Sequence, residues 1–158
     1  MLDEAVACLR EGLRGRAAAY TRCYGLAGLA EALARQGEHD AALAAAREGL
    51  ETEERLGQRR WTAELRRLKG IALFGLNQPE EGQNALEDAI RVARGQGAKS
   101  YELRAATSLA LLWADRGRRA DARDLLAPIY GWFTEGFDTL DLKEAKALLD
   151  ELASQPSS

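Results

Sequence analysis

Apolar residues recur at every third or fourth position through most of the chain, which predicts helices that each turn one face toward a core. The clearest example is the stripe formed by Leu26, Leu29, Ala30 and Leu33. The same spacing returns near the end of the chain, in DLKEAKALLDEL (141–152). Alanine, leucine, glutamate and arginine dominate, β-branched residues are scarce and there are 3 prolines, so we expect an all-α chain.

Helix start and stop signals divide the chain into helix pairs. We expect first helices over about 17–36, 60–76 and 99–116, each followed by a partner that ends near 56, 95 and 134 respectively. Pro79 fits the first turn of its helix, whereas Pro128 lies inside a helix and should kink it. The predicted single domain covers 1–153 and consists of a half repeat (1–15), pairs over 17–56, 60–96 and 98–134, and a capping helix (139–153), with a disordered tail at 154–158.

An internal repeat places glycine or asparagine at equivalent turns. Gly37, Asn77 and Gly117 follow one another at an offset of 40, and Gly57 falls on Gly97 under the same offset. This register explains GQGAKS (95–100), which resembles a phosphate-binding loop at first sight. That loop requires glycine at positions held here by Ala93 and Ala98, and it should follow a strand rather than a helix. We therefore interpret GQGAKS as the turn between repeats, where a glycine in the left-handed conformation ends the preceding helix.

The helix pairs resemble tetratricopeptide (TPR) repeats, whose signature is W-x2-L-G-x2-Y followed by A-x3-F. The second pair departs from the signature at Arg66, Lys69 and Gly82, and the period of 40 exceeds the usual one. The resemblance implies a right-handed superhelical solenoid of antiparallel helix pairs with a concave inner face. The residues at signature positions are Leu26, Leu29, Ala30, Leu33, Ala42 and Ala46 in the first pair, Gly70, Leu73 and Leu86 in the second, and Ala106, Leu109, Ala110, Trp113, Ala122 and Leu126 in the third.

A second resemblance covers the C-terminal third of the chain. Residues 102–152, which include LLWADRGRRADARDLLAPIYGWF, resemble the C-terminal region of bacterial multidomain regulators. Those proteins join a class III nucleotide cyclase or similar signalling domain to an AAA-type ATPase and a TPR region. The resemblance implies a helical repeat segment cut from, or related to, such a regulator. It implies no catalytic residue, because the family's metal-binding aspartates and phosphate loop belong to its other domains.

Composition argues against several classes of function. A net charge of −3 gives no general attraction to nucleic acid or to an anionic membrane. Cys8, Cys23 and His39 are too few and too separated for a disulfide framework or a metal site, so we expect no metal or cofactor and regard these residues as buried. No apolar run is long enough to span a bilayer, and the N-terminus lacks a signal peptide's pattern, so we expect a cytoplasmic protein.

Trp113 and a later group of aromatic residues are expected to lie in the core. Trp113 falls on a packing stripe. Tyr130, Trp132, Phe133 and Phe137 follow the predicted kink, and we expect them to be buried beneath the last helix. A partner-binding site is the alternative for this second group.

The predicted function is non-catalytic protein–protein recognition or scaffolding, with an unidentified protein or peptide as partner. A ligand- or peptide-sensing domain that relays binding to linked ATPase or cyclase domains is the alternative. An enzyme is a weaker one, because no nucleophile, base or metal set converges. The concave face should be formed by residues of the first helices that lie off the packing stripes. These are Tyr24, Glu31, Arg35, Arg67, Ile71, Phe74, Arg104, Leu111 and Asp115.

The N-terminal segment aligns with the second helix of a repeat. DEAVACLREGL (3–13) should cover the following pair through Ala5, Val6, Leu9 and Leu13. Its opposite face would then be open to upstream sequence of a longer protein or to a second copy. We expect a homodimer through this helix.

Overall fold

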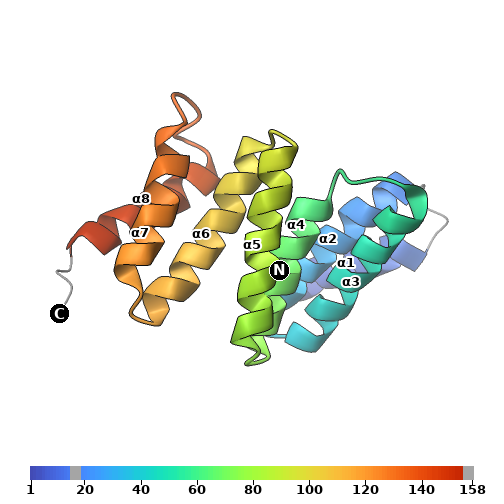
Figure 1. Ribbon diagram of the computed structural model, residues 1–158. Coiled ribbons are helices and arrows are strands. Elements are labelled where there is room, and N and C mark those ends of the chain that lie inside the picture. Colours follow the sequence, from blue (N-terminus) through green and yellow to red (C-terminus); the bar gives the residue numbers. More distant parts are fainter. Residues whose placement is uncertain (15–18, 155–158) are drawn as a thin grey trace. The chain divides into compact units, whose positions relative to one another are not determined.

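A computed structural model describes residues 1–14 and 19–154 of the 158-residue chain. The described part consists of eight α-helices and contains no strand, which confirms the all-α prediction (Figure 1). The chain forms two compact units, Met1–Ala89 and Ile90–Ser158, and the boundary falls inside helix α5 (Pro79–Gly95).

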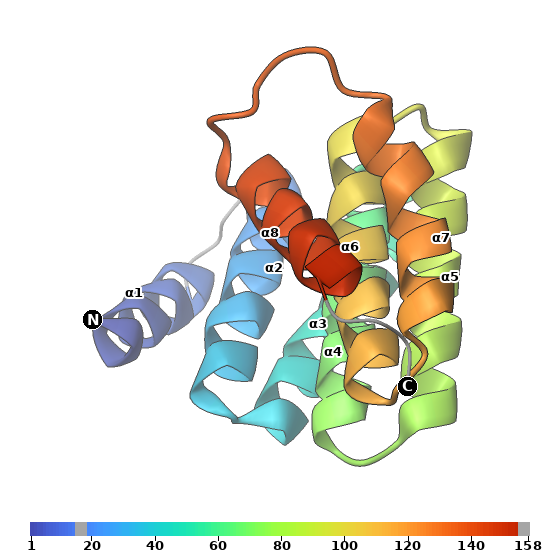
Figure 2. The ribbon, with the colours of Figure 1, turned by 90° about the vertical axis from the view of Figure 1, so that its left-hand side faces the viewer.

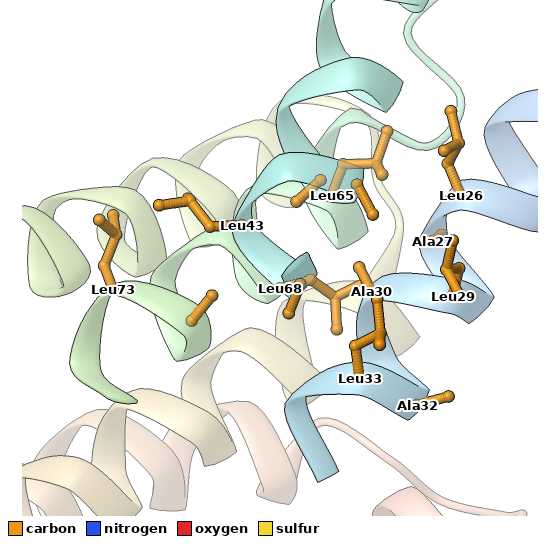
Figure 3. Packing of buried hydrophobic residues seen from close by; sticks show 14 of the residues in the cluster. Leu26, Ala27, Leu29, Ala30, Ala32, Leu33, Leu43, Leu65, Leu68 and Leu73 are labelled. Carbon is orange, nitrogen blue, oxygen red and sulfur yellow. The ribbon is translucent and has the colours of Figure 1, made fainter. Parts of the chain in front are cut away.

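The first unit contains α1 (Leu2–Arg14), α2 (Ala19–Gln36), α3 (His39–Leu56), α4 (Thr62–Gly75) and the start of α5. Each of the first three helices packs on the next, and α2 also packs on α4, the first helix of the following pair. This is the arrangement expected of stacked helix pairs. Figure 3 shows the core between α2, α3 and α4, to which all three helices contribute leucines. The labelled residues are Leu26, Ala27, Leu29, Ala30, Ala32, Leu33, Leu43, Leu65, Leu68 and Leu73.

The second unit contains the end of α5, α6 (Lys99–Asp115), α7 (Arg119–Gly131) and α8 (Leu140–Ser154). Helices α6 and α7 pack as a pair, and α8 lies across both of them (Figure 2). The buried side chains of α8 are Leu142, Ala145, Leu148 and Leu152, so the predicted capping helix packs through the predicted face. Successive helices therefore pack on their neighbours within each unit, as in a helical solenoid.

The turns between helices have the predicted conformation. Gly37, Asn77 and Gly117 have φ angles of 81°, 59° and 79°, and Gly57 and Gly97 both have 65°. These values lie in the left-handed region, which glycine adopts without steric cost and asparagine tolerates. At Gly97 the turn is closed by bonds from the Gly97 and Ala98 amides to carbonyl oxygens of α5, at 3.0 and 2.9 Å. GQGAKS is thus a helix-ending turn that follows a helix, as the repeat register predicts.

The second helix pair departs from the TPR signature at a place where two backbones approach closely. A methyl group at Gly82 of α5 would lie 2.5 Å from Cδ2 of Phe74 and 3.0 Å from the carbonyl oxygen of Gly70 in α4. A methyl group at Gly70 would lie 2.9 Å from the carbonyl oxygen of Gly82. Alanine, which the signature requires at position 82, would not fit here unless α4 and α5 moved apart.

Three predicted boundaries were wrong by a few residues. Helix α4 begins at Thr62 rather than 60, because the carboxylate of Glu53 accepts a bond from the Trp61 amide at 2.6 Å and fixes the helix start there. Helix α7 ends at Gly131 rather than 134, just after Pro128, and the chain leaves it through bonds of the tighter i→i−3 type. Ser154, assigned to the tail, is the last residue of α8, while 155–158 and the predicted helix start at 17–18 lie outside the described residues.

Candidate interaction surface

Within the first unit, three of the predicted concave-face residues lie together. Glu31 of α2 accepts a bond from Nη2 of Arg35 at 3.1 Å, one turn further along the same helix. Nη2 of Arg67 on α4 lies 3.7 Å from the same Glu31 oxygen. The helical phase assigned to α2 and α4 therefore brings these side chains to one place.

Arg67 is nevertheless not the exposed residue that the sequence suggested. Only 7% of its surface is exposed, because its guanidinium packs against Glu64, one turn earlier on α4. Nε and Nη2 of Arg67 donate to Oε2 and Oε1 of Glu64 at 3.0 and 2.7 Å, which is a two-pronged ion pair. The prediction that this arginine is exposed was wrong, since a buried carboxylate holds it within the helix layer.

The other predicted residues of the first unit differ in accessibility. Tyr24 is 59% exposed, and its ring lies against that of Trp61 with centroids 5.2 Å apart. Ile71 and Phe74 are half-buried, and the Phe74 ring occupies the space over Gly82. Tyr24 is therefore the accessible aromatic side chain of this group.

In the second unit, the predicted residues lie along one face of α6. Leu111 is 48% exposed and Asp115, one turn later, is also exposed. Arg104 is half-buried, and its Nη1 lies 3.7 Å from Oδ1 of Asp141 at the start of α8. The capping helix therefore contacts the beginning of this face, and Leu111 is the large apolar side chain on it that solvent reaches.

The aromatic residues after Pro128 are not buried beneath the last helix, and that prediction was wrong. Trp132 is 58% exposed and Phe137 is 47% exposed, whereas Tyr130 and Phe133 are half-buried. The reason is that α7 ends at Gly131, so residues 132–139 form a loop that extends beyond the ends of α7 and α8 (Figure 2).

Trp113 is also less buried than its signature position suggested. It is half-buried at the end of α6, and the guanidinium carbon of Arg118 lies 4.3 Å from its ring centroid. A cation over the ring face stabilises an aromatic side chain that remains partly in water. The prediction of a fully packed tryptophan was therefore too strong.

The residues considered for metal or redox chemistry are dispersed. Cys23 is buried and Cys8 is exposed, so the prediction that both are buried holds for Cys23 alone. Burial raises the pKa of the Cys23 thiol, with a smaller contribution in the same direction from Glu53. His39 is half-buried and its ring fills the space next to Gly75, the last residue of α4. Residues 1–14 and 19–154 contain no group of three His, Cys, Asp or Glu side chains that could hold a metal ion.

Sequence reasoning did not anticipate the buried carboxylates. Glu102 of α6 is only 3% exposed, and it accepts bonds from Nε of Arg94 at 2.5 Å and from Nζ of Lys99 at 3.0 Å. Burial by itself would raise the pKa of Glu102, but the bonds from these two cations outweigh it and lower the pKa. Lys99, the lysine of GQGAKS, is thus engaged with a carboxylate, and its Nζ also lies 5.3 Å from the ring centroid of Trp132.

The N-terminal helix packs on α2 through most of the predicted residues. Val6 is buried, and methyl carbons of Leu9 and Leu13 lie against Gly28 and Gly25 of α2. Ala5 is exposed and does not cover the neighbouring helix, so that part of the prediction was wrong. Self-association through this helix stays a prediction.

None of the described helices is long and apolar enough to cross a membrane. Comparison with known proteins found no matching family model, no matching curated protein and no matching solved structure.

Proposed function

We propose that the chain is a non-catalytic protein-binding module of TPR-like type, which recognises its partner through the exposed faces of its first helices. The observation that carries the proposal is the exposure of Tyr24 on α2 and Leu111 on α6, at 59% and 48% of their surfaces. Both side chains lie off the packing stripes, so neither is needed to fill the core of its unit.

The residues around these two side chains suit a binding surface. The Tyr24 ring is held against Trp61, so little side-chain freedom would be lost when a partner covers it. Arg35 and Asp115 are exposed on the same helices and add charged side chains to their exposed faces. Tyrosine and arginine are enriched among residues that dominate binding energy at protein interfaces, and polar residues usually surround such a centre.

The resemblance of the repeats to TPR domains supports the same proposal, because solenoids of this kind bind partners along a concave surface. A right-handed superhelix, a cytoplasmic location and a scaffolding role within a bacterial signalling regulator are further parts of the proposal. The superhelix and the scaffolding role rest on the sequence resemblances described above, and the location rests on the sequence pattern.

The test compares partner retention by the wild-type protein and by two double variants. The immobilised protein is incubated with cell extract, and bound proteins are quantified by mass spectrometry. Tyr24→Ala/Leu111→Ala should retain a specific partner at least about tenfold less well, as expected when interface anchors are truncated. Leu56→Ala/Arg123→Ala alters exposed residues of the second helices α3 and α7, and it should bind like the wild type. Equal retention by all three proteins would contradict the proposal.

A further inference from the structure

The loop between α7 and α8, together with the first residue of α8, carries three large apolar side chains that solvent reaches. Trp132, Phe137 and Leu140 are 58%, 47% and 61% exposed, within nine consecutive residues of the chain. We call residues 132–140 the aromatic loop. Isolated exposed apolar residues are common on protein surfaces, whereas several of them within one short segment mark an interaction site more often.

The aromatic loop is held in place by its own bonds. Gly136 has a φ of 77°, and its carbonyl oxygen accepts bonds from the Thr139 amide at 2.9 Å and from the Thr139 hydroxyl at 2.7 Å. The Thr139 carbonyl in turn accepts a bond from the Lys143 amide at 3.0 Å, in the first turn of α8. The loop is therefore anchored to the helix that follows it.

Each of the two exposed rings of the loop lies against one neighbouring ring. Trp132 and Phe133 meet edge to face with centroids 5.2 Å apart and planes at 86°. Phe137 lies against Tyr130 at the end of α7, with centroids 6.1 Å apart. A surface that is ordered before binding loses less conformational entropy when a partner covers it.

The core of the second unit does not use the exposed side chains of the loop. Helix α8 packs through Leu142, Ala145, Leu148 and Leu152, which are all buried. Trp132, Phe137 and Leu140 lie before this packing face in the chain and remain largely in water. Their apolar surface therefore costs solubility without a matching gain in the packing of this unit.

The charges beside the loop indicate the chemistry of the partner. Glu135 and Asp138 lie within the loop and are both exposed. The segment 132–144 contains four carboxylates and one lysine, and Asp141 pairs with Arg104, so the carboxylates outnumber the cations and the net charge here is negative. Nζ of Lys99 lies 5.3 Å from the Trp132 ring centroid and adds one positive charge beside the loop, where the carboxylates still outnumber the cations. A second copy of the chain, docked loop to loop, would bring like charges together, whereas a basic partner would be attracted.

We propose that the aromatic loop is a docking site for a basic, aliphatic segment of another protein. Leucine-like side chains of the partner contact Trp132, Phe137 and Leu140, and its lysine or arginine side chains pair with Glu135 and Asp138. This inference goes beyond the proposed function, since it places a second binding surface away from the first helices.

The test uses two fluorescein-labelled amphipathic peptides of equal length and identical leucine positions, whose polar positions are all lysine or all glutamate. Binding to the full chain is followed by fluorescence anisotropy at low ionic strength. The lysine peptide should bind at least about tenfold more tightly than the glutamate peptide, and added salt should weaken its binding. No detectable binding of the lysine peptide, or equal affinity for both peptides, overturns the proposal.

Matched variants distinguish peptide binding at the loop from a general attraction of the lysine peptide to an acidic protein. Trp132→Ala should weaken binding of the lysine peptide at least about tenfold, as the loss of a central aromatic contact does. Glu135→Gln/Asp138→Asn keeps every ring and should weaken binding several-fold while flattening its salt dependence. Glu51→Gln/Glu54→Gln removes the same charge from the exposed face of α3 and should change the affinity little. Equal weakening by both charge variants overturns the proposal.

Two further outcomes identify a different occupant or a different site. Circular dichroism first establishes that each variant keeps the helix content of the wild type. If Tyr24→Ala/Leu111→Ala abolishes peptide binding while Trp132→Ala does not, the first helices bind the peptide, which refutes the loop and favours the proposed function. If light scattering finds a wild-type dimer that Trp132→Ala converts to a monomer, the occupant is a second copy and the proposed basic partner is wrong.

Discussion

Replacing Gly70 by alanine tests the close approach of α4 and α5. A methyl group at this position would lie 2.7 Å from Cγ of Leu86 and 2.9 Å from the carbonyl oxygen of Gly82. Leu86 is fully buried, and the second contact is backbone, so neither atom can move aside without shifting α5. Adding atoms to a well-packed core costs about 1–3 kcal/mol, whereas the exchange of glycine for alanine inside a helix gains about 0.5–1 kcal/mol. We expect a net loss of about 1–2 kcal/mol in the free energy of unfolding.

The matched control is Gly28→Ala, which makes the same substitution in the interior of α2. There the new methyl group would lie 3.6 Å from Cδ2 of Leu9, which is an ordinary van der Waals contact. The gain in helix propensity remains, so this variant should be more stable than the wild type by about 0.5–1 kcal/mol. Thermal unfolding followed by circular dichroism compares the three proteins, since 1 kcal/mol shifts the Tm of a protein near this size by about 2–4 °C. If Gly70→Ala melts at or above the wild-type temperature, the close packing of α4 on α5 is refuted.

The buried ion pair, a buried carboxylate and a half-buried ring give further predictions. Arg67→Ala leaves the buried Glu64 without its two-pronged partner and should lower the free energy of unfolding by about 3–5 kcal/mol in a urea titration. Arg35→Ala, the exposed control, should lower it by less than about 1 kcal/mol, and equal losses would contradict the burial of the pair. The pKa of Glu102 is lowered in the folded protein, so its contribution to stability is present above the ordinary carboxyl pKa and is lost as the pH falls through the lowered value. The wild type should therefore lose more stability than Glu102→Gln between about pH 5 and about pH 2, and parallel losses would refute the assignment. Trp113→Ala should lower the free energy of unfolding by about 2 kcal/mol, which is less than the roughly 3–5 kcal/mol lost with a fully buried tryptophan. A loss in that higher range would mean that the ring belongs to the core.

The regular part of the fold could be predicted because its causes are local in sequence. Gly37, Asn77 and Gly117 end helices through their own backbone preferences, and their offset is visible without any knowledge of tertiary contacts. Helical spacing of leucine and alanine is likewise enough to identify the buried faces of α2 and α8. Gly82 departs from the repeat signature, and the structure gives the reason: the ring of Phe74 fills the space that the methyl group of an alanine would need.

The candidate site could be predicted only in part, because position off a packing stripe does not decide exposure. Arg67 lies on the expected face, yet its bonds to Glu64 bury it, and this pairing depends on tertiary packing around both residues. The exposure of Trp132 depends on where α7 ends, and a shift of three residues converts a predicted helix end into a loop. Tyr24 and Leu111 lie off the packing stripes and are exposed, as their positions in the helices predict.

The most direct test of the account is hydroxyl-radical footprinting of the protein, alone and bound to its purified partner. In the free protein Tyr24 and Leu111 should be oxidised readily, while Leu65 and Leu109, which are at most 1% exposed, should be protected. The partner should reduce oxidation of Tyr24 and Leu111 and leave the exposed Leu56 of α3 unchanged. Protection of Leu56 with unchanged oxidation of Tyr24 and Leu111 would place the binding surface on the second helices and contradict the proposed function.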